Sequence, residues 1–179
     1  MNKKQLAILS IGNILNKDEG IALYASKYLE LNYSFNPSVD IIHGDVEGMS
    51  LLNIFMQYEK VIVLDVIGVD DTPGSIYNFP MKEFRNLGSD ESSEDMGVLE
   101  CLNLLEGRRE VLPDVSLLAI VPDSLDKEMG LSPILHHSME AYVLNIVKAI
   151  EAQGFTYDEK EEKESLDSVI ESFANRDWA

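Results

Sequence analysis

The sequence predicts an α/β fold, a three-layer α/β/α sandwich with a mostly parallel, twisted sheet and one antiparallel edge strand. Short apolar runs, which are typical of buried strands, alternate along the chain with longer segments whose apolar residues recur at helical spacing. Glycines follow several of these segments and end them. Alternation of this kind is typical of parallel strands joined by right-handed helical crossovers.

Five apolar runs are predicted to be strands. The first ends at a Gly-Asn pair, and the third is the most strand-like because it is apolar and largely β-branched. The turn at residues 70–74 precedes the run that we assign to the sheet edge. In chain order the predicted strands are residues 6–11, 39–43, 61–64, 75–79 and 115–121.

Four segments are predicted to be helices because their apolar residues lie three or four positions apart. Ser132 and Pro133 supply a favourable N-cap and first position for the last of them, which continues to Gly154. Residues 32–37 are expected to form an irregular break after the first helix. The predicted helices are residues 19–31, 48–58, 95–107 and 133–154.

The chain is predicted to form one α/β peptidase-like domain over residues 1–154, followed by an acidic C-terminal extension over residues 155–179. Residues 158–164 hold five acidic residues and two lysines. The apolar residues Leu166, Ile170 and Phe173 then recur at helical spacing. This extension is interpreted either as a short docked helix or as a mobile arm.

A net charge of -18 argues against nucleic acids and anionic membrane surfaces as partners, because their phosphates would be repelled. No stretch approaches the roughly 18 to 20 apolar residues that a membrane span requires. The first apolar run is also too short for a signal-peptide core. The single cysteine, Cys101, excludes an internal disulfide, so a protein of the reducing cytoplasm is expected.

Acidic residues follow two of the predicted strands. Asp18 and Glu19 lie in the loop after the first strand, and Asp65 follows the third. Ligands of open α/β sheets bind outside the carboxyl ends of the strands, so we expect Glu19 and Asp65 to meet at one edge and to bind a cation. Asp18 either caps the following helix or holds Glu19 in place. For Asp65 the alternative is a bond to backbone N–H groups of the turn at Gly68.

The segment Gly-Asn-Ile-Leu-Asn-Lys-Asp-Glu-Gly resembles the signature of the hydrogenase maturation endopeptidases. Those proteases remove the C-terminal extension of a [NiFe]-hydrogenase large-subunit precursor once nickel has been inserted. The resemblance therefore implies their fold, an endopeptidase activity and such a precursor as the partner, with the protein itself expected to be a monomer. It covers roughly residues 6–152 and rests on residues 12–20, 43–48, 63–66, 72–74, 122–125 and 130–132.

The resemblance also implies a metal site. In the family, an acidic residue of the first loop, an aspartate ending the third strand and a histidine before the third long helix bind metal. The first two positions fall on Glu19 and Asp65, which become the candidate catalytic and metal-binding residues. The third falls on Glu94, which is not a histidine, and His43 stands where the family usually carries an aspartate.

Three interpretations of the missing histidine remain open. Glu94 serves as an oxygen ligand, His43 supplies an imidazole, or the site is weakened and the chain is a non-catalytic or divergent metal- or protein-binding module. A set of carboxylates alone suits harder divalent cations such as Mg²⁺, Mn²⁺ or Ca²⁺. The resemblance implies instead that nickel is the metal and that it arrives with the substrate.

The residues offer little support for other catalytic classes. Ser10 lies inside a predicted strand without a nucleophile elbow, and Cys101 lies between apolar residues of a helix. His136 and His137 are interpreted as surface or packing residues, and no zinc-protease or nucleotide-binding motif is present. A phosphoacceptor receiver domain is disfavoured because residues 121–123 read Val-Pro-Asp, without the lysine it needs. Peptide hydrolysis would then depend on a metal that polarises the carbonyl or activates water.

Overall fold

The central element is a five-stranded sheet in the order β3-β1-β4-β6-β5. The computed structural model describes residues 2–44, 49–84 and 95–175. All neighbouring strands of the sheet are parallel except β5, which runs antiparallel to β6 at the edge. The predicted fold class is therefore confirmed. The strands are β1 (Lys4–Ser10), β3 (Asp40–His43), β4 (Tyr58–Val66), β5 (Ile76–Pro80) and β6 (Asp114–Ile120).

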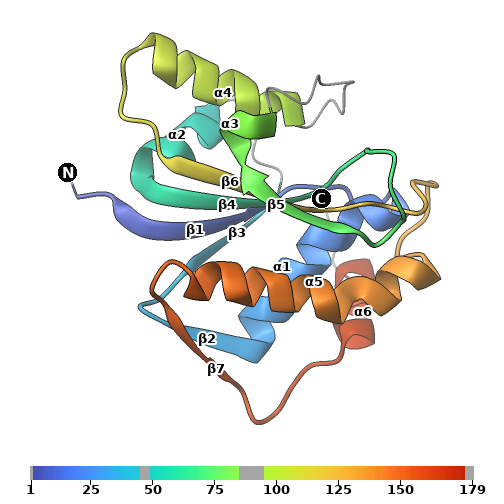
Figure 1. Ribbon diagram of the computed structural model, residues 1–179. Coiled ribbons are helices and arrows are strands. Elements are labelled where there is room, and N and C mark those ends of the chain that lie inside the picture. The colour runs from blue at the N-terminus through green and yellow to red at the C-terminus, as the bar shows by residue number, and fades with distance from the viewer. Residues whose placement is uncertain (1, 45–48, 85–94, 176–179) are drawn as a thin grey trace.

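Helices cover both faces of this sheet (Figure 1). On one face α1 and α5 pack together, and α6 packs on α1. On the other face lie α2, α3 and α4. The helices are α1 (Ile21–Asn32), α2 (Met49–Gln57), α3 (Met81–Phe84), α4 (Asp95–Gly107), α5 (Pro133–Glu151) and α6 (Leu166–Ala174), and a 3-10 turn, η1 (Lys17–Gly20), precedes α1.

Strand β4 is buried on both faces and divides the apolar interior into two clusters. Ile62 and Leu64 belong to the cluster under α1 and α5, whereas Val61 and Val63 belong to the cluster under α2 and α4. This follows from the strand period of two, and it explains the uninterrupted apolar run in the sequence. The side to which any β4 residue points can therefore be read from its position.

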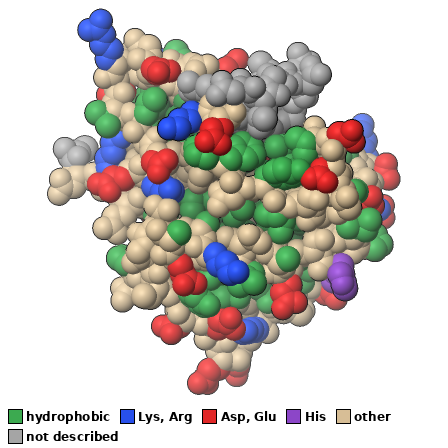
Figure 2. Space-filling model, viewed as in Figure 1, with side chains coloured by type: hydrophobic (Ala, Val, Ile, Leu, Met, Phe, Trp, Pro, Cys, Tyr) green, Lys and Arg blue, Asp and Glu red, His purple; other side chains and the backbone are tan. Residues whose placement is uncertain are grey.

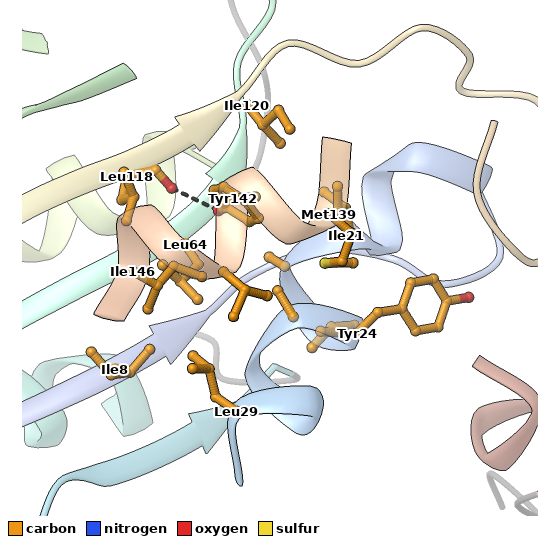
Figure 3. Packing of buried hydrophobic residues seen from close by; sticks show 14 of the residues in the cluster. Ile8, Ile21, Tyr24, Leu29, Leu64, Leu118, Ile120, Met139, Tyr142 and Ile146 are labelled. Carbon is orange, nitrogen blue, oxygen red and sulfur yellow. Dashed lines mark hydrogen bonds between the residues drawn. The ribbon is translucent and has the colours of Figure 1, made fainter. Parts of the chain in front are cut away.

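Tyr142 of α5 lies fully buried in the first cluster (Figure 3). Its hydroxyl donates to the carbonyl oxygen of Leu118 at 2.8 Å, so the only polar atom of the side chain has a partner. The pKa of this phenol is raised well above its usual range, first by burial and then by the Asp65 carboxylate. Tyr142 thus remains a neutral donor that fixes α5 against the sheet.

A second, two-stranded sheet was not predicted. Strand β2 (Tyr33–Asn36), in the segment expected to be irregular, pairs antiparallel with β7 (Thr156–Glu159). Both strands have only four residues, too short for a clear alternating pattern, and they are separated by most of the chain. The buried side chain of Asn32 reinforces this pairing by bonding the backbone N–H and carbonyl of Glu164 at 2.7 and 3.1 Å.

Helix α6 is docked on the first helix. Val169 and Phe173 are buried, and the ring of Phe173 meets that of Tyr24 edge-on, with centroids 5.2 Å apart. His136 of α5 is bonded to Asp167 of α6 at 2.8 Å. Residues 156–174 therefore add a strand and a helix to the α1 side of the domain.

No helix within residues 2–44, 49–84 and 95–175 is both long and apolar enough to cross a membrane.

The docking of α6 leads to a stability prediction. Phe173→Ala removes a ring that is 3% exposed, so we expect the free energy of unfolding to fall by about 3 kcal/mol or more. Urea unfolding followed by circular dichroism measures the change. Glu171→Ala on the exposed side of the same helix is the matched control and should change the midpoint very little. An equal response of the two variants would mean that α6 is not anchored by its apolar face.

Candidate functional site

The loop after β1 folds back onto the carboxyl end of its own strand. Ile11 N–H donates to the Leu64 carbonyl at 2.9 Å, and Asn13 N–H donates to the Glu19 carbonyl at 3.2 Å. A Cβ atom on Gly12 would lie 2.1 Å from that Glu19 carbonyl oxygen, so only glycine permits this approach. The turn η1 consequently packs against β4, beside the strand end that carries Asp65.

Asp18 is the most constrained polar residue of this loop. Its carboxylate is fully buried and accepts four hydrogen bonds. The backbone N–H groups of Asp123 and Ser124 and the Ser132 hydroxyl donate to Oδ2 at 2.9, 2.9 and 2.8 Å, and Ser132 N–H donates to Oδ1 at 2.7 Å. Such donors stabilise a buried negative charge without a cation. Asp18 therefore fixes the loop after β1 to the loop between β6 and α5.

The prediction that Asp18 caps the following helix is wrong. The N-cap of α1 is Gly20, and no side chain caps that helix. Asp18 instead bonds Ser132, which is itself the N-cap of α5 and accepts from Leu135 N–H. The partners of Asp18 lie more than 100 residues away in sequence, so no local pattern could have identified them. The alternative role, holding Glu19 in place, is consistent with the bonds on both sides of the loop.

Backbone strain in η1 also indicates that the loop is held in one conformation. Lys17 has a φ of 49°, a conformation that residues other than glycine rarely adopt. Its N–H donates to the Glu128 carbonyl at 2.7 Å, and its ammonium group lies 3.1 Å from the Glu128 carboxylate. The surrounding bonds therefore hold a costly backbone conformation immediately before Asp18 and Glu19.

Glu19 lies between the fixed Asp18 and the buried Gly20, with its side chain partly exposed. Its Oε2 accepts a hydrogen bond of 2.6 Å from the Asn16 amide. The side chain is otherwise accessible to solvent on the rim of the sheet. Glu19 is therefore a positioned but accessible carboxylate.

Asp65 is the next-to-last residue of β4 and is 2% exposed. Its Oδ1 accepts from the N–H of Val66 at 2.7 Å. Because the flanking Leu64 points towards α1 and α5, the side chain of Asp65 points towards the face covered by α2 and α4. The carboxylate thus lies at the end of a buried strand, on the side of the sheet where α4 begins.

His43 points to the opposite face. It is aligned with Ser10 across the β1–β3 pair, and Ser10 is aligned with Leu64. Its Nδ1 lies 2.8 Å from the Ser26 hydroxyl, which is 2.9 Å from the Ser10 hydroxyl, and its Nε2 lies 3.4 Å from Glu30. This hydrogen-bonded cluster connects the outer strand to α1.

Glu94, the remaining predicted ligand, lies outside the described residues. Within the ranges that are described, no group of three or more His, Cys, Asp or Glu side chains could together hold a metal ion. The structure brings the Glu19 loop to β4 but does not join His43 to Glu19 and Asp65 in such a group. Two carboxylates on one rim can bind a cation that other ligands already hold.

The two residues considered as nucleophiles are not accessible. Ser10 is completely buried, and its hydroxyl bonds Ser26 and the Ile42 carbonyl. Cys101 is buried in α4, and burial, followed by the charge of Glu100, raises the pKa of its thiol. A neutral, enclosed thiol is a poor nucleophile.

Sequence comparisons match this chain to proteins of hydrogenase maturation and formation. The family model HycI, described as hydrogenase maturation protease, matches residues 23–150. The chain is 26% identical over 152 residues to hydrogenase 2 maturation protease of Escherichia coli K12, a match that covers 84% of this chain and 93% of that protein. It is 27% identical over 121 residues to the hydrogenase expression/formation protein HupD of Bradyrhizobium diazoefficiens, covering 68% of this chain and 59% of HupD.

Solved structures agree with these sequence matches. The hydrogenase maturating endopeptidase HybD from E. coli superposes with a TM-score of 0.79 at 25% identity, covering 87% of this chain and 98% of HybD. The [NiFe] hydrogenase maturation protease HybD from Thermococcus kodakarensis gives a TM-score of 0.66 at 25% identity, covering 81% and 98% of the two chains.

The Asp18 bonds predict a large loss of stability from a small change. In Asp18→Ala, three buried or half-buried backbone N–H groups and the Ser132 hydroxyl lose their acceptor, so we expect the free energy of unfolding to fall by about 3 kcal/mol or more. Chemical denaturation measures this. Asp123→Ala, at an exposed side chain in the bonded loop, is the control and should be near neutral. A mild Asp18→Ala variant would show that the loops are held by other contacts.

Proposed function

Because the chain belongs to the hydrogenase maturation protease family, we propose that it removes the C-terminal extension of a [NiFe]-hydrogenase large-subunit precursor after nickel insertion. The observation that carries this proposal is the rim of the sheet, where the partly exposed Glu19 is held beside β4, the strand that carries Asp65 next to its final residue. Ligands of open α/β folds bind at this edge.

In this proposal Glu19 and Asp65 recognise the nickel ion of the substrate. Glu19 is partly exposed, so a docked precursor reaches it first, whereas Asp65 is buried at the end of β4. Two negative charges at one rim favour a precursor that carries its cation over one that lacks it. The ion supplies a Lewis acid that polarises a carbonyl. Binding through a metal already held by the substrate requires only few ligands from the protease.

Residues of the protease must also activate the attacking water. Ser10 and Cys101 are enclosed, so neither supplies a nucleophile. A carboxylate can accept a proton from water, and Glu19 is the accessible carboxylate of the pair. The Asn16 amide and the bonds of Asp18 orient this side chain.

The proposal includes a cellular compartment and a partner. A single cysteine suits the reducing cytoplasm. The partner is the large-subunit precursor, on which the protein acts as a monomer. The charge of -18 suits a metal-bearing or basic protein surface.

Charge-neutral substitutions test the two carboxylates. Glu19→Gln and Asp65→Asn keep the shape of the side chains but remove their charge, so we expect both to abolish processing while the thermal midpoint barely moves. The assay is incubation with a nickel-loaded large-subunit precursor, followed by mass spectrometry of the truncated product. Glu151→Gln, an exposed carboxylate at the far end of α5, is the control and should process normally.

Two results would contradict this assignment. Loss of folding in parallel with loss of processing would make these carboxylates structural. Absence of cleavage by the wild-type protein across several nickel-loaded precursors would favour the non-catalytic binding module.

The third ligand is tested by a comparison of Glu94→His with His43→Ala. If Glu94 is the third ligand, Glu94→His should change cleavage or nickel affinity, because imidazole binds nickel more strongly than a carboxylate does. If His43 is the ligand, His43→Ala should lower both. Isothermal titration with Ni²⁺ and the processing assay measure the effects. Unchanged behaviour in both variants would eliminate both candidates.

A further inference from the structure

Exposed apolar side chains are gathered around the Glu19 loop. Leu15, in that loop, is 59% exposed, and Leu125 and Met129, in the loop between β6 and α5, are 53% and 37% exposed. Ile134 at the start of α5 is 43% exposed. Elsewhere on the visible face of the molecule, hydrophobic side chains are interspersed with acidic ones (Figure 2). We refer to Leu15, Leu125, Met129 and Ile134 as the rim patch.

Hydrogen bonds join the two loops that carry the rim patch. Lys17 N–H donates to the Glu128 carbonyl at 2.7 Å, which joins the chain next to Leu15 and the chain next to Met129. Asp18 N–H donates to the Ser124 carbonyl at 3.1 Å, next to Leu125. Each apolar side chain is therefore held within a few residues of a bonded anchor.

The backbone of both loops is held by these bonds, and this matters for binding. Side chains on a pre-organised surface lose little conformational entropy when a partner covers them. Contiguous exposed apolar groups with polar residues around them are typical of protein interaction sites. Leu15 lies only four positions before Glu19, so a partner that reaches the carboxylate also meets the patch.

The charges around the patch identify the kind of partner. Asp123, Asp126 and Glu128 are exposed in the same loop, and the ammonium of Lys17 is already paired with Glu128. Lys127 is the remaining exposed cation of that loop. The border is therefore acidic on balance, and the whole chain carries a charge of -18. A second copy of this chain would bring like charges together, which disfavours self-association through the patch.

We propose that the rim patch binds the polypeptide of the substrate precursor, at a segment whose apolar side chains are flanked by lysine or arginine and lie next to the bond to be cut. This inference depends on the proposed function and adds to it a second recognition element. Glu19 and Asp65 recognise the metal, and the rim patch binds the polypeptide of the precursor around it. Recognition then depends on the metal and on the sequence of the segment independently.

The test uses the full-length protein with the nickel-loaded precursor. Leu15→Ser and Leu125→Ser should each raise KM for processing about tenfold or more, with kcat within about twofold of wild type. Leu104→Ser, at a leucine 50% exposed on α4, is the matched control and should leave both constants unchanged. Asp126→Lys should also raise KM, and high salt should reduce that difference.

A second measurement separates this inference from the proposed function. Binding of the nickel-free precursor, measured by biolayer interferometry, should weaken in the two leucine variants. Normal cleavage by all variants would overturn the proposed role of the rim patch and would leave the proposed protease function standing. If the precursor is not cleaved but its binding is weakened in the leucine variants, the proposed protease function is overturned and the binding role of the rim patch is retained.

Two further outcomes also decide the inference. A wild-type protein that neither cuts nor binds the precursor would overturn both proposals. A wild-type dimer in light scattering that the leucine variants dissociate would assign the patch to self-association instead.

Discussion

The buried carboxylate of Asp18 is the constraint on which the arrangement of this site depends. Four donors from residues 123–132 surround it, and none of them carries a charge. Burial of a lone carboxylate is costly, and these donors offset that cost only when both loops adopt one conformation. The position of Glu19, the start of α5 and the pairing of the two loops that carry the rim patch all follow from this requirement.

Much of the architecture was predictable because it depends on local patterns. The five strands of the main sheet and the four principal helices follow from apolar periodicity, glycine positions and the Ser132–Pro133 start signal. The short strands β2 and β7 escaped prediction because each gains its stability from the other, across more than 100 residues. Tertiary context, and not local preference, determines such pairs.

The site shows the same division. Glu19 and Asp65 could be proposed as candidates because loops at the carboxyl ends of strands are recognisable from sequence. The environment of His43 could not be predicted, because the face of the sheet to which its side chain points depends on the register of β3 against β1. A shift of one residue would turn the side chain to the other face of the sheet. The partners of Asp18 were equally hidden, since a backbone N–H group has no signature in a sequence.

The contact between Phe173 and Tyr24 has a consequence for biosynthesis. A ribosome synthesises α6 more than 130 residues after α1, so part of the apolar surface of the first helix stays uncovered until α6 has emerged. Pairing of β2 with β7 is delayed in the same way. The nascent chain therefore cannot complete its interior from the N-terminus onwards, and completion of the domain depends on the emergence of β7 and α6 from the exit tunnel.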